Sequence, residues 1–360
     1  MRRTPALIVG GGPAGSAAAI RLAQGGARPL LIERHIDADA LCGGFVSWRT
    51  IDRIAALGVD PDTLNRDRLT RATIFAGSRV REASLPRPAI GVSRRRLDTL
   101  LRAAAERSGA AIETGVTVRS IDGLTACITD GEDIEADALF LASGKHDIRG
   151  QARPAAARGA DPTLGIRVRL GPAPGLTRAL GDRIELHLFD RGYAGIALQE
   201  DGSANLCMAV HRSRLQAAGT PADLLTALGR EFPRLGERLA HRDTRAPIDA
   251  IANVPYGWRQ RGGKPGLFRL GDQAGVIPSL AGEGMGIALA SGIAAADAYL
   301  LGGPAAAAGW QRRFGRRLAR PIAIAGAARA IAESRWAGTA VAMMPPHLIQ
   351  VMAHATRMAP

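Results

Sequence analysis

The sequence predicts an α/β protein with three parts: a domain built on a parallel sheet, an antiparallel sheet inserted into it, and a helical tail. Three observations predict this arrangement. An apolar strand, a glycine-rich turn, a helix and a second apolar strand follow one another within residues 6–33, which is the order of a β-α-β unit. Segments that alternate apolar and polar residues fill residues 163–212. Alanine-rich helical segments run from residue 304 to the end.

The turn of the first unit has the spacing G-x-G-x-x-G directly after a strand and at the start of a helix. Gly10 permits a tight turn, Gly12 lets the backbone approach a pyrophosphate, and Gly15 allows close packing of helix on strand. The helix N-terminus favours the negative phosphates. Glu33 closes the second strand, where a carboxylate accepts hydrogen bonds from a ribose diol. We therefore predict a dinucleotide site in a Rossmann-like domain.

Later segments return to the same domain. Residues 96–108 have helical periodicity, residues 136–144 form an apolar strand that ends in small residues, and residues 266–272 form a short strand that ends in glycine and aspartate. The glycine-rich stretch at 282–286 then opens another apolar helix. We expect a discontinuous dinucleotide-binding domain at 1–155 plus 246–303, a sheet domain that carries the substrate cavity at 156–245, and a C-terminal helical segment at 304–360.

Composition narrows the classes of partner. The chain has 47 Lys+Arg against 33 Asp+Glu, and Lys145 and Lys264 are its only lysines. We interpret the net charge of +14 mainly as an arginine-rich composition, with attraction to an anionic partner or membrane surface as the alternative. Aromatic residues make up 4% and no zinc-ligand spacing occurs, so nucleic acid is not expected as a partner, and no metal site is predicted.

Cysteine usage and the chain ends favour a cytoplasmic protein. Cys42, Cys127 and Cys207 form no C-x-x-C pair, which argues against a disulfide framework and fits a reducing compartment. Two arginines precede the first apolar run as in a signal peptide, but glycines interrupt that run. Residues 336–356 carry no formal charge, and the doublet Pro345-Pro346 would break a spanning helix. A peripheral membrane contact of this tail is left open.

Five segments in order resemble the FAD-dependent superfamily of p-hydroxybenzoate hydroxylase-type monooxygenases, geranylgeranyl reductases and flavin-dependent halogenases. They are "IVGGGPAGSAAAIRLA" with "LLIER", "VSRRRLDTLLRAAAERSGAAIETG", "TVRSI", "ADALFLASGKHDIRG" and "RLGDQAGVIPSLAGEGMGIALASG". The resemblance covers residues 5–300. It implies a glutathione-reductase-like, p-hydroxybenzoate hydroxylase-type fold with FAD as cofactor and NAD(P)H as a transient reductant.

The resemblance also implies which residues hold FAD. Arg94 would approach the cofactor, the backbone of Val118 would contact adenine, and Asp272 would bind the ribityl chain. The helix start at 282–286 would offer N–H groups to the pyrimidine edge of the flavin and stabilise negative charge on the reduced ring. The expected cofactor-binding residues are Gly10, Gly12, Pro13, Ala14, Gly15, Glu33, Arg34, Cys42, Gly43, Gly44, Arg94, Val118, Ala142, Ser143, Gly144, Gly271, Asp272, Gly282, Gly284 and Met285.

A catalytic side-chain set is not required by the sequence, because a flavin carries the redox chemistry itself. Cys42 is a candidate at the flavin or substrate, with a small residue in a tight loop as the structural alternative. His146 follows a strand end, where ligands gather in open α/β sheets, with a surface turn as the alternative. Glu283 adjoins the expected flavin, with an acid favoured by the helix dipole as the alternative.

Weaker candidates lie on or beside the inserted sheet. Tyr193 and Tyr256 can donate hydrogen bonds to a substrate. His187 and His211 stand on strands that could wall the cavity, but structural strand histidines are the favoured interpretation.

Three hypotheses for the activity follow. The first is an NAD(P)H-driven monooxygenase acting on an aromatic or polyketide-like apolar substrate. The second is a geranylgeranyl-reductase-like enzyme that saturates isoprenoid or alkene double bonds, which the segments "LCGGFVSW" and "GYAGIALQEDGSANLC" favour. The third is a non-catalytic or electron-carrying flavin-binding protein at a membrane.

Two departures from the family pattern bear on these hypotheses. Ser143-Gly144 replaces an Asp-Gly pair that the hydroxylases use with nicotinamide, and the halogenase signature W-x-W-x-I-P is absent. The first weakens any inference about how NAD(P)H is used, and the second disfavours halogenation. The sequence leaves the oligomeric state open.

Overall fold

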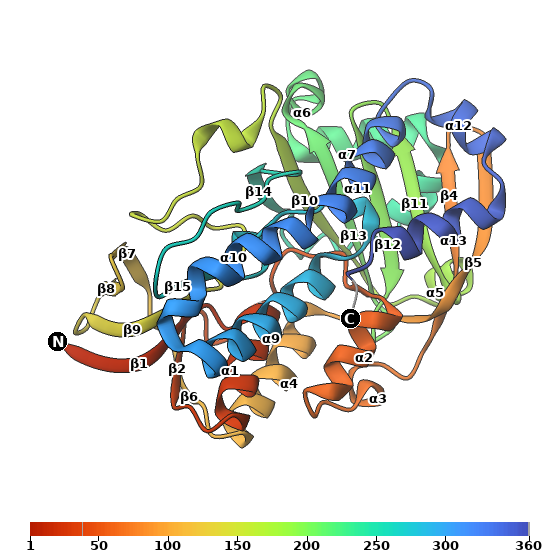
Figure 1. The fold of residues 1–360 in the computed structure, drawn as a ribbon. Helices are drawn as coiled ribbons and strands as arrows, with labels where there is room; N and C mark the ends of the chain where they lie inside the picture. Colours follow the sequence, from red (N-terminus) through yellow and green to blue (C-terminus); the bar gives the residue numbers. More distant parts are fainter. Residues whose placement is uncertain (38, 359–360) are drawn as a thin grey trace.

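The computed structural model describes residues 1–37 and 39–358 and arranges them around two sheets that lie end to end (Figure 1). The first sheet, on the left of Figure 1, has the order β6 (Ala111–Thr114), β2 (Pro29–Glu33), β1 (Arg2–Val9), β9 (Ile134–Leu141), β8 (Thr125–Ile128) and β7 (Val118–Asp122), and β15 (Leu267–Arg269) also pairs with β9. Its strands β6, β2, β1, β9 and β15 are parallel, whereas β8 and β7 return antiparallel. The predicted α/β fold class is confirmed.

Helix α1 (Pro13–Gln24) links β1 to β2 and lies against α9 (Gly284–Gly302), which comes from the far end of the domain. Small residues make this contact possible: a Cβ at Gly292 of α9 would stand 2.3 Å from the carbonyl oxygen of Ala14. Ala17 and Ala18 are fully buried at the same contact. The two glycine-rich segments of the sequence therefore start neighbouring helices.

The second sheet, on the right of Figure 1, has the order β14 (Asp249–Val254), β10 (Thr163–Leu170), β13 (Ala204–His211), β12 (Gly192–Leu198), β11 (Arg183–Phe189), β4 (Leu69–Ala76), β5 (Arg79–Gly91) and β3 (Phe45–Val46). The predicted antiparallel strands within 163–212 are present as β10–β13. β4, however, pairs parallel with β11, which extends the sheet through a hairpin from much earlier in the chain.

The membership of this sheet differs from the sequence interpretation. β3, β4, β5 and β14 come from ranges that were assigned to the dinucleotide-binding domain. The sequence does not predict the hairpin β4–β5, because two prolines and several charged residues in β5 mask the alternation of apolar and polar residues that marks a strand. The domain boundaries stay a prediction. The second sheet contains strands from both the range predicted for the dinucleotide-binding domain and the range predicted for the sheet domain.

Helices cover both sheets. α4 (Arg94–Arg107) packs beside α1, α2 (Trp48–Ala56) lies beside α9, and α7 (Pro221–Glu231) with α8 (Pro233–Leu239) covers the second sheet around Leu224 and Leu228. The shorter helices are α3 (Pro61–Leu64), α5 (Pro174–Leu180) and α6 (Arg212–Ala218), with 3-10 turns at Ala155–Arg158, Gly271–Gln273, Ser279–Ala281 and Gly303–Ala305.

The tail consists of α10 (Ala306–Arg317), α11 (Ala319–Ala332), α12 (Ala337–Met343) and α13 (Pro346–Ala355). Pro345-Pro346 separates the last two helices, as the sequence predicts. In Figure 1 the tail crosses from the first sheet to the second, and α12 and α13 lie on β4 and β5. The tail thus bridges the two sheets.

One helical run among the described residues, Gly284–Ala332, is long and apolar enough to cross a membrane by length and composition alone. Core helices meet the same criterion, and 44% of the apolar window is buried inside the protein. α9, which begins this run, packs on α1 in the main core cluster.

Candidate active site

A cavity of about 590 Å³ runs from the glycine turn after β1, between the two sheets, to the tail helices α11–α13. Predicted cofactor residues from five separate parts of the sequence meet on its wall. The predicted cofactor residues that line it are Gly12, Pro13, Ala14, Cys42, Gly43, Gly44, Arg94, Ala142, Gly144, Gly271, Asp272, Gly282, Gly284 and Met285. A volume of this size is typical of a buried small-molecule site.

Two helix N-termini open onto this cavity. The N-cap residue of α1 is Gly12, which has no side chain, and that of α9 is Glu283, whose side chain makes no capping hydrogen bond. The first backbone N–H groups of both helices therefore have no side-chain cap. A Cβ at Gly284 would meet nothing within 4 Å, so the start of α9 faces open space. Uncapped helix N-termini attract anions. The residues present therefore fit a cofactor with a diphosphate at one end and an electron-accepting ring at the other, as FAD has.

The remaining glycines of the first motif have packing roles. Gly10 has φ +109°, and a Cβ there would lie 2.5 Å from the carbonyl oxygen of Ala142. A Cβ at Gly15 would overlap the carbonyl oxygen of Gly10 at 1.9 Å. Glu33 accepts hydrogen bonds from the backbone N–H groups of Gly11, at 2.6 Å, and His35, at 3.0 Å. The carboxylate is thereby fixed beside the glycine turn, where the sequence places a ribose.

Arg94 reaches the cavity from the first turn of α4. Its guanidinium forms a bidentate pair with Asp98, with nitrogen–oxygen distances of 3.0 and 2.7 Å. Burial alone would lower the pKa of Arg94, but the Asp98 carboxylate outweighs it and raises the pKa. Arg94 therefore stays cationic beside the N-terminus of α1, since a Cβ at Gly12 would lie 3.1 Å from its Nη2. This arrangement places a guanidinium, already paired with Asp98, where a diphosphate would bind.

Asp272 and Lys145 form an ion pair on the cavity wall, with 3.3 Å between Nζ and Oδ2. The Asp272 carboxylate raises the pKa of Lys145, so the ammonium is charged at neutral pH. The guanidinium of Arg153 holds the backbone of both residues in place by donating hydrogen bonds to their carbonyl oxygens. The sequence interpretation missed Lys145 and Arg153. The available signal was that Lys145 is one of two lysines in an arginine-rich chain.

The three catalytic candidates have different surroundings. Cys42 lines the cavity, and its Sγ accepts a hydrogen bond from the N–H of Gly44 at 3.5 Å. His146 is exposed in the turn after β9 and does not line the cavity; partial desolvation of its ring, together with the nearby cations Arg34 and Lys145, lowers its pKa. This placement matches the structural alternative, a surface turn.

Glu283 is fully buried and does not line the cavity, although its neighbours Gly282 and Gly284 do. Its carboxylate pairs with Arg357 at 3.3 Å and accepts hydrogen bonds from the N–H of Met358 and the hydroxyl of Ser47. Burial raises the pKa of Glu283, which Arg357 opposes. The Glu283 side chain thus binds Arg357 and the backbone of Met358 and is not on the cavity wall, and a catalytic role for it stays a prediction.

Three hydroxyl groups form a cluster on the cavity wall. The phenol oxygens of Tyr193 and Tyr256 lie 2.7 and 2.8 Å from Oγ of Ser279, and Tyr193 accepts from the N–H of Leu280. Burial raises the pKa of both tyrosines, which keeps their phenols protonated as donors. Most of the surrounding wall is aliphatic or glycine, so this cluster is its main neutral polar feature.

The remaining candidates are distributed as follows. His187 is buried between Phe75, on which it stacks, and Glu185, and His211 bonds to Asp161 and Glu333, so both are structural strand histidines. Outside the lining are Arg34, Val118 at the start of β7, and Ser143, whose hydroxyl donates to the carbonyl oxygen of His146. The described residues contain no group of three or more His, Cys, Asp or Glu able to hold a metal ion.

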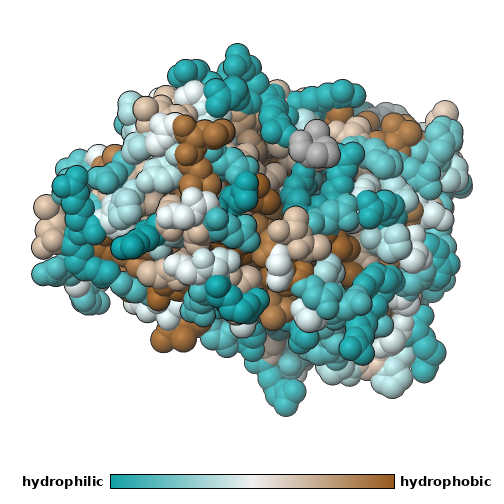
Figure 2. All heavy atoms as spheres, turned by 60° about the horizontal axis from the view of Figure 1, so that its bottom comes forward, coloured by the Kyte–Doolittle hydropathy of each residue, from teal (hydrophilic) through white to brown (hydrophobic). Residues whose placement is uncertain are grey.

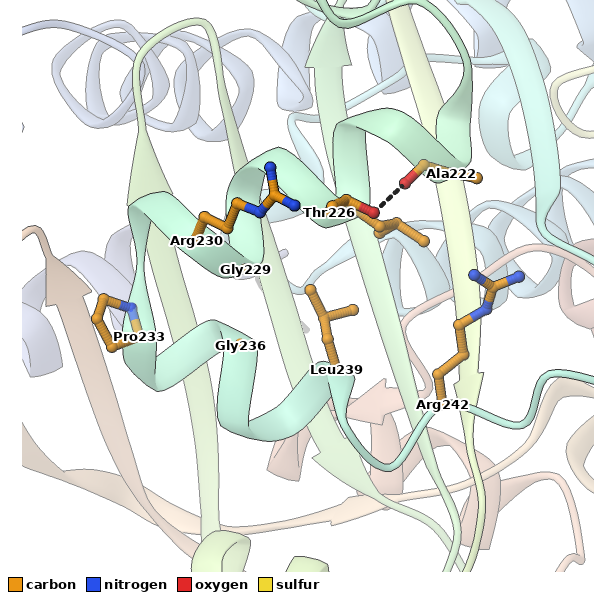
Figure 3. A pocket seen from close by; sticks show the side chains of 9 residues that line it. Ala222, Thr226, Gly229, Arg230, Pro233, Gly236, Leu239 and Arg242 are labelled. Atoms are coloured by element: carbon orange, nitrogen blue, oxygen red, sulfur yellow. Dashed lines mark hydrogen bonds between the residues drawn. The ribbon is translucent and has the colours of Figure 1, made fainter.

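A second hollow, of about 440 Å³, lies on α7 and α8, where Arg230 and Arg242 border it (Figure 3). It shares no lining residue with the cavity between the sheets. The two helices approach closely at Gly229 and Gly236, where a Cβ at Gly236 would stand 2.5 Å from the carbonyl oxygen of Gly229. This hollow is a surface groove between two packed helices.

Comparison with known proteins agrees with this geometry. Residues 3–155 match the family model described as FAD binding domain. The chain is 30% identical over 164 residues to the chloroplastic geranylgeranyl diphosphate reductase of Arabidopsis thaliana, a match that covers 40% of this chain and 34% of the reductase. The match thus spans about a third of the length of that curated relative.

Solved structures match over nearly the whole chain. A flavoprotein/dehydrogenase from Cytophaga hutchinsonii has a TM-score of 0.79 at 15% identity, covering 98% of this chain and 93% of that one. PqsL from Pseudomonas aeruginosa, described as "a probable FAD-dependent monooxygenase", has a TM-score of 0.71 at 17% identity, covering 95% and 100%.

These solved structures share the fold of this chain, and the predicted fold is confirmed. Residues 3–155 match the FAD binding domain, and the resemblance to FAD-dependent oxidoreductases expected from the sequence is confirmed. The use of NAD(P)H and the individual cofactor contacts stay predictions.

Proposed function

We propose that the chain is an NAD(P)H-driven flavoprotein monooxygenase that hydroxylates an aromatic or polyketide-like apolar substrate. The observation that carries this proposal is the hydroxyl cluster of Tyr193, Tyr256 and Ser279 on a largely apolar cavity wall. Such a wall fits a substrate with an apolar body and one phenolic or carbonyl group, because an oriented hydroxyl pair would hold that group in place.

The chain's own residues position both reactants. The N-terminus of α1 with Arg94 would hold the diphosphate of FAD, Asp272 the ribityl chain, and the N-terminus of α9 the ring edge. Bound FAD would supply the redox chemistry, taking up a hydride and passing the electrons to oxygen or to a double bond. The apolar residues of α11–α13 would exclude water from the reacting end of the cavity.

The second candidate is a reductase of isoprenoid or alkene double bonds. Two observations favour it: the partial match to geranylgeranyl diphosphate reductase, and the position of Cys42 on the cavity wall beside Gly43-Gly44. The third hypothesis, a non-catalytic or electron-carrying flavoprotein at a membrane, predicts bound FAD without turnover. A cytoplasmic location is a proposal too, supported by three free cysteines.

Turnover measurements separate these hypotheses. The purified chain loaded with FAD is given NADH or NADPH and either alkylated phenols or prenyl compounds, with and without oxygen. The monooxygenase proposal expects substrate to raise both NAD(P)H oxidation and oxygen consumption, with a hydroxylated product. Saturation of a double bond in the absence of oxygen would overturn it in favour of the reductase, and FAD retention without any turnover would favour the carrier.

Replacing Tyr256 with phenylalanine tests the hydroxyl cluster. The variant should raise KM for a phenolic substrate about 3- to 10-fold, because one neutral hydrogen bond is lost, with little change in kcat. Tyr299→Phe is the matched control, since its hydroxyl bonds to the carbonyl oxygen of Pro5 outside the cavity. Steady-state kinetics provide the measurement. Equal KM values in the two variants would show that the hydroxyl cluster does not bind the substrate.

A further inference from the structure

The tail carries a concentration of exposed apolar side chains. Of the nine large hydrophobic residues exposed in the described part of the chain, five lie between residues 331 and 351. This tail patch consists of Ile331, Trp336, Met343, Leu348 and Val351, with exposed fractions between 37% and 80%. Grouped exposed hydrophobic residues mark interaction surfaces, whereas single ones are ordinary. Figure 2 shows one face of the molecule, on which hydrophobic residues are interspersed among a hydrophilic majority.

The tail patch coincides with an opening of the cavity. Ile331, Met343 and Leu348 are exposed to solvent and also line the cavity. Val341, Ile349 and Met352 of the same helices line this cavity as well, as does Gly284 at the start of α9. An apolar ligand could therefore pass from whatever covers the patch into the cavity along a continuous apolar path.

The charges around the patch indicate what covers it. Residues 337–356 contain no Asp, Glu, Lys or Arg. Arg335 lies over the ring of Trp336 at 5.1 Å, and Arg81 of β5 donates to the carbonyl oxygens of Val341 and Ala342. The neighbouring acid Glu333 is turned inward to Arg329 and His211.

An exposed Trp beside Arg on an uncharged apolar surface is the composition of an interfacial membrane contact. The net charge of +14 complements an anionic surface.

We propose that the tail patch docks on the surface of an anionic lipid bilayer, so that the cavity exchanges apolar ligand directly with the bilayer. The exchange rests on the proposed function, because it needs an apolar substrate. The docking does not, since it follows from the surface alone. Salt screens the attraction between the arginines and the anionic lipid but not the apolar insertion, so binding should weaken with rising salt.

Vesicle co-sedimentation tests the docking. The full chain loaded with FAD is mixed with vesicles of phosphatidylglycerol and phosphatidylcholine in equal parts, and with phosphatidylcholine alone. We expect binding to the anionic vesicles that weakens with salt. The double variant Met343→Glu, Val351→Glu should have an affinity for the anionic vesicles at least about tenfold lower, because two inserted apolar side chains are replaced by charges. Leu301→Glu is the matched control, since Leu301 is 91% exposed and lies outside the tail patch.

The outcomes separate cleanly. Wild-type protein that stays in the supernatant, or an equal loss of binding in the Leu301 variant, would overturn the docking. So would a concentration-dependent dimer, seen by size-exclusion chromatography and lost in the double variant, because a second copy would then cover the patch. Unchanged melting temperature and FAD content show that the variants are folded. Vesicle binding without substrate turnover would refute the monooxygenase proposal and retain the docking.

Discussion

Replacing Asp272 with alanine is expected to weaken FAD binding about 10- to 100-fold, because a charge-assisted hydrogen bond to the ribityl chain is lost. The loss has a second source. Lys145, 3.3 Å away, would be left on the cavity wall without its carboxylate partner. Titration of the apoprotein with FAD, followed by quenching of flavin fluorescence, gives the dissociation constant.

Asp297→Ala provides the control for that experiment. Asp297 lies on α9 but pairs with Arg21 on the outside of the helix contact, so its loss should leave FAD binding unchanged. If the Asp272 and Asp297 variants bind FAD equally well, Asp272 does not contact the cofactor and the orientation of FAD along the cavity must be redrawn.

Breaking the ion pair of Glu283 and Arg357 should lower the free energy of unfolding by about 3–5 kcal/mol, because removal of one partner leaves a buried charge uncompensated. Both side chains are almost completely buried, at 0% and 3% exposure. Glu283→Gln and Arg357→Met should each show this loss in urea denaturation followed by circular dichroism.

The double variant Glu283→Gln, Arg357→Met is the decisive comparison. It removes both charges, while the glutamine carbonyl oxygen can still accept from the N–H of Met358 and its amide NH2 can donate to the hydroxyl oxygen of Ser47. We expect it to be more stable than either single variant. Strictly additive losses would contradict a coupled buried pair and assign the cost to packing alone.

The cofactor half of the site was largely predictable, because its determinants are local and repeated along the chain. Gly10 and Gly15 must be glycine for one geometric reason: neighbouring backbone atoms come closer to them than a Cβ atom would permit. The second such turn at 282–286 identified the other helix start. These features need no knowledge of distant contacts.

The substrate half was less predictable, because it depends on which distant segments meet. Sequence spacing gives no sign that the hairpin β4–β5 pairs with β11, or that the tail helices wall the cavity. Glu283 shows the same limit: its position beside two cavity glycines suggested chemistry, while its side chain serves an ion pair with a residue 74 positions later. The Lys145–Asp272 pair likewise joins two turns that only the folded sheet brings together.

The close approach of Gly292 to Ala14 has a consequence for how this protein can be divided. The segment that matches the FAD-binding domain, residues 3–155, supplies only one of the two helix N-termini on the cavity, and α1 buries its alanine face against α9. That segment is therefore not a self-sufficient module. A fragment that ends before α9 would present only one of these two helix N-termini to a cofactor.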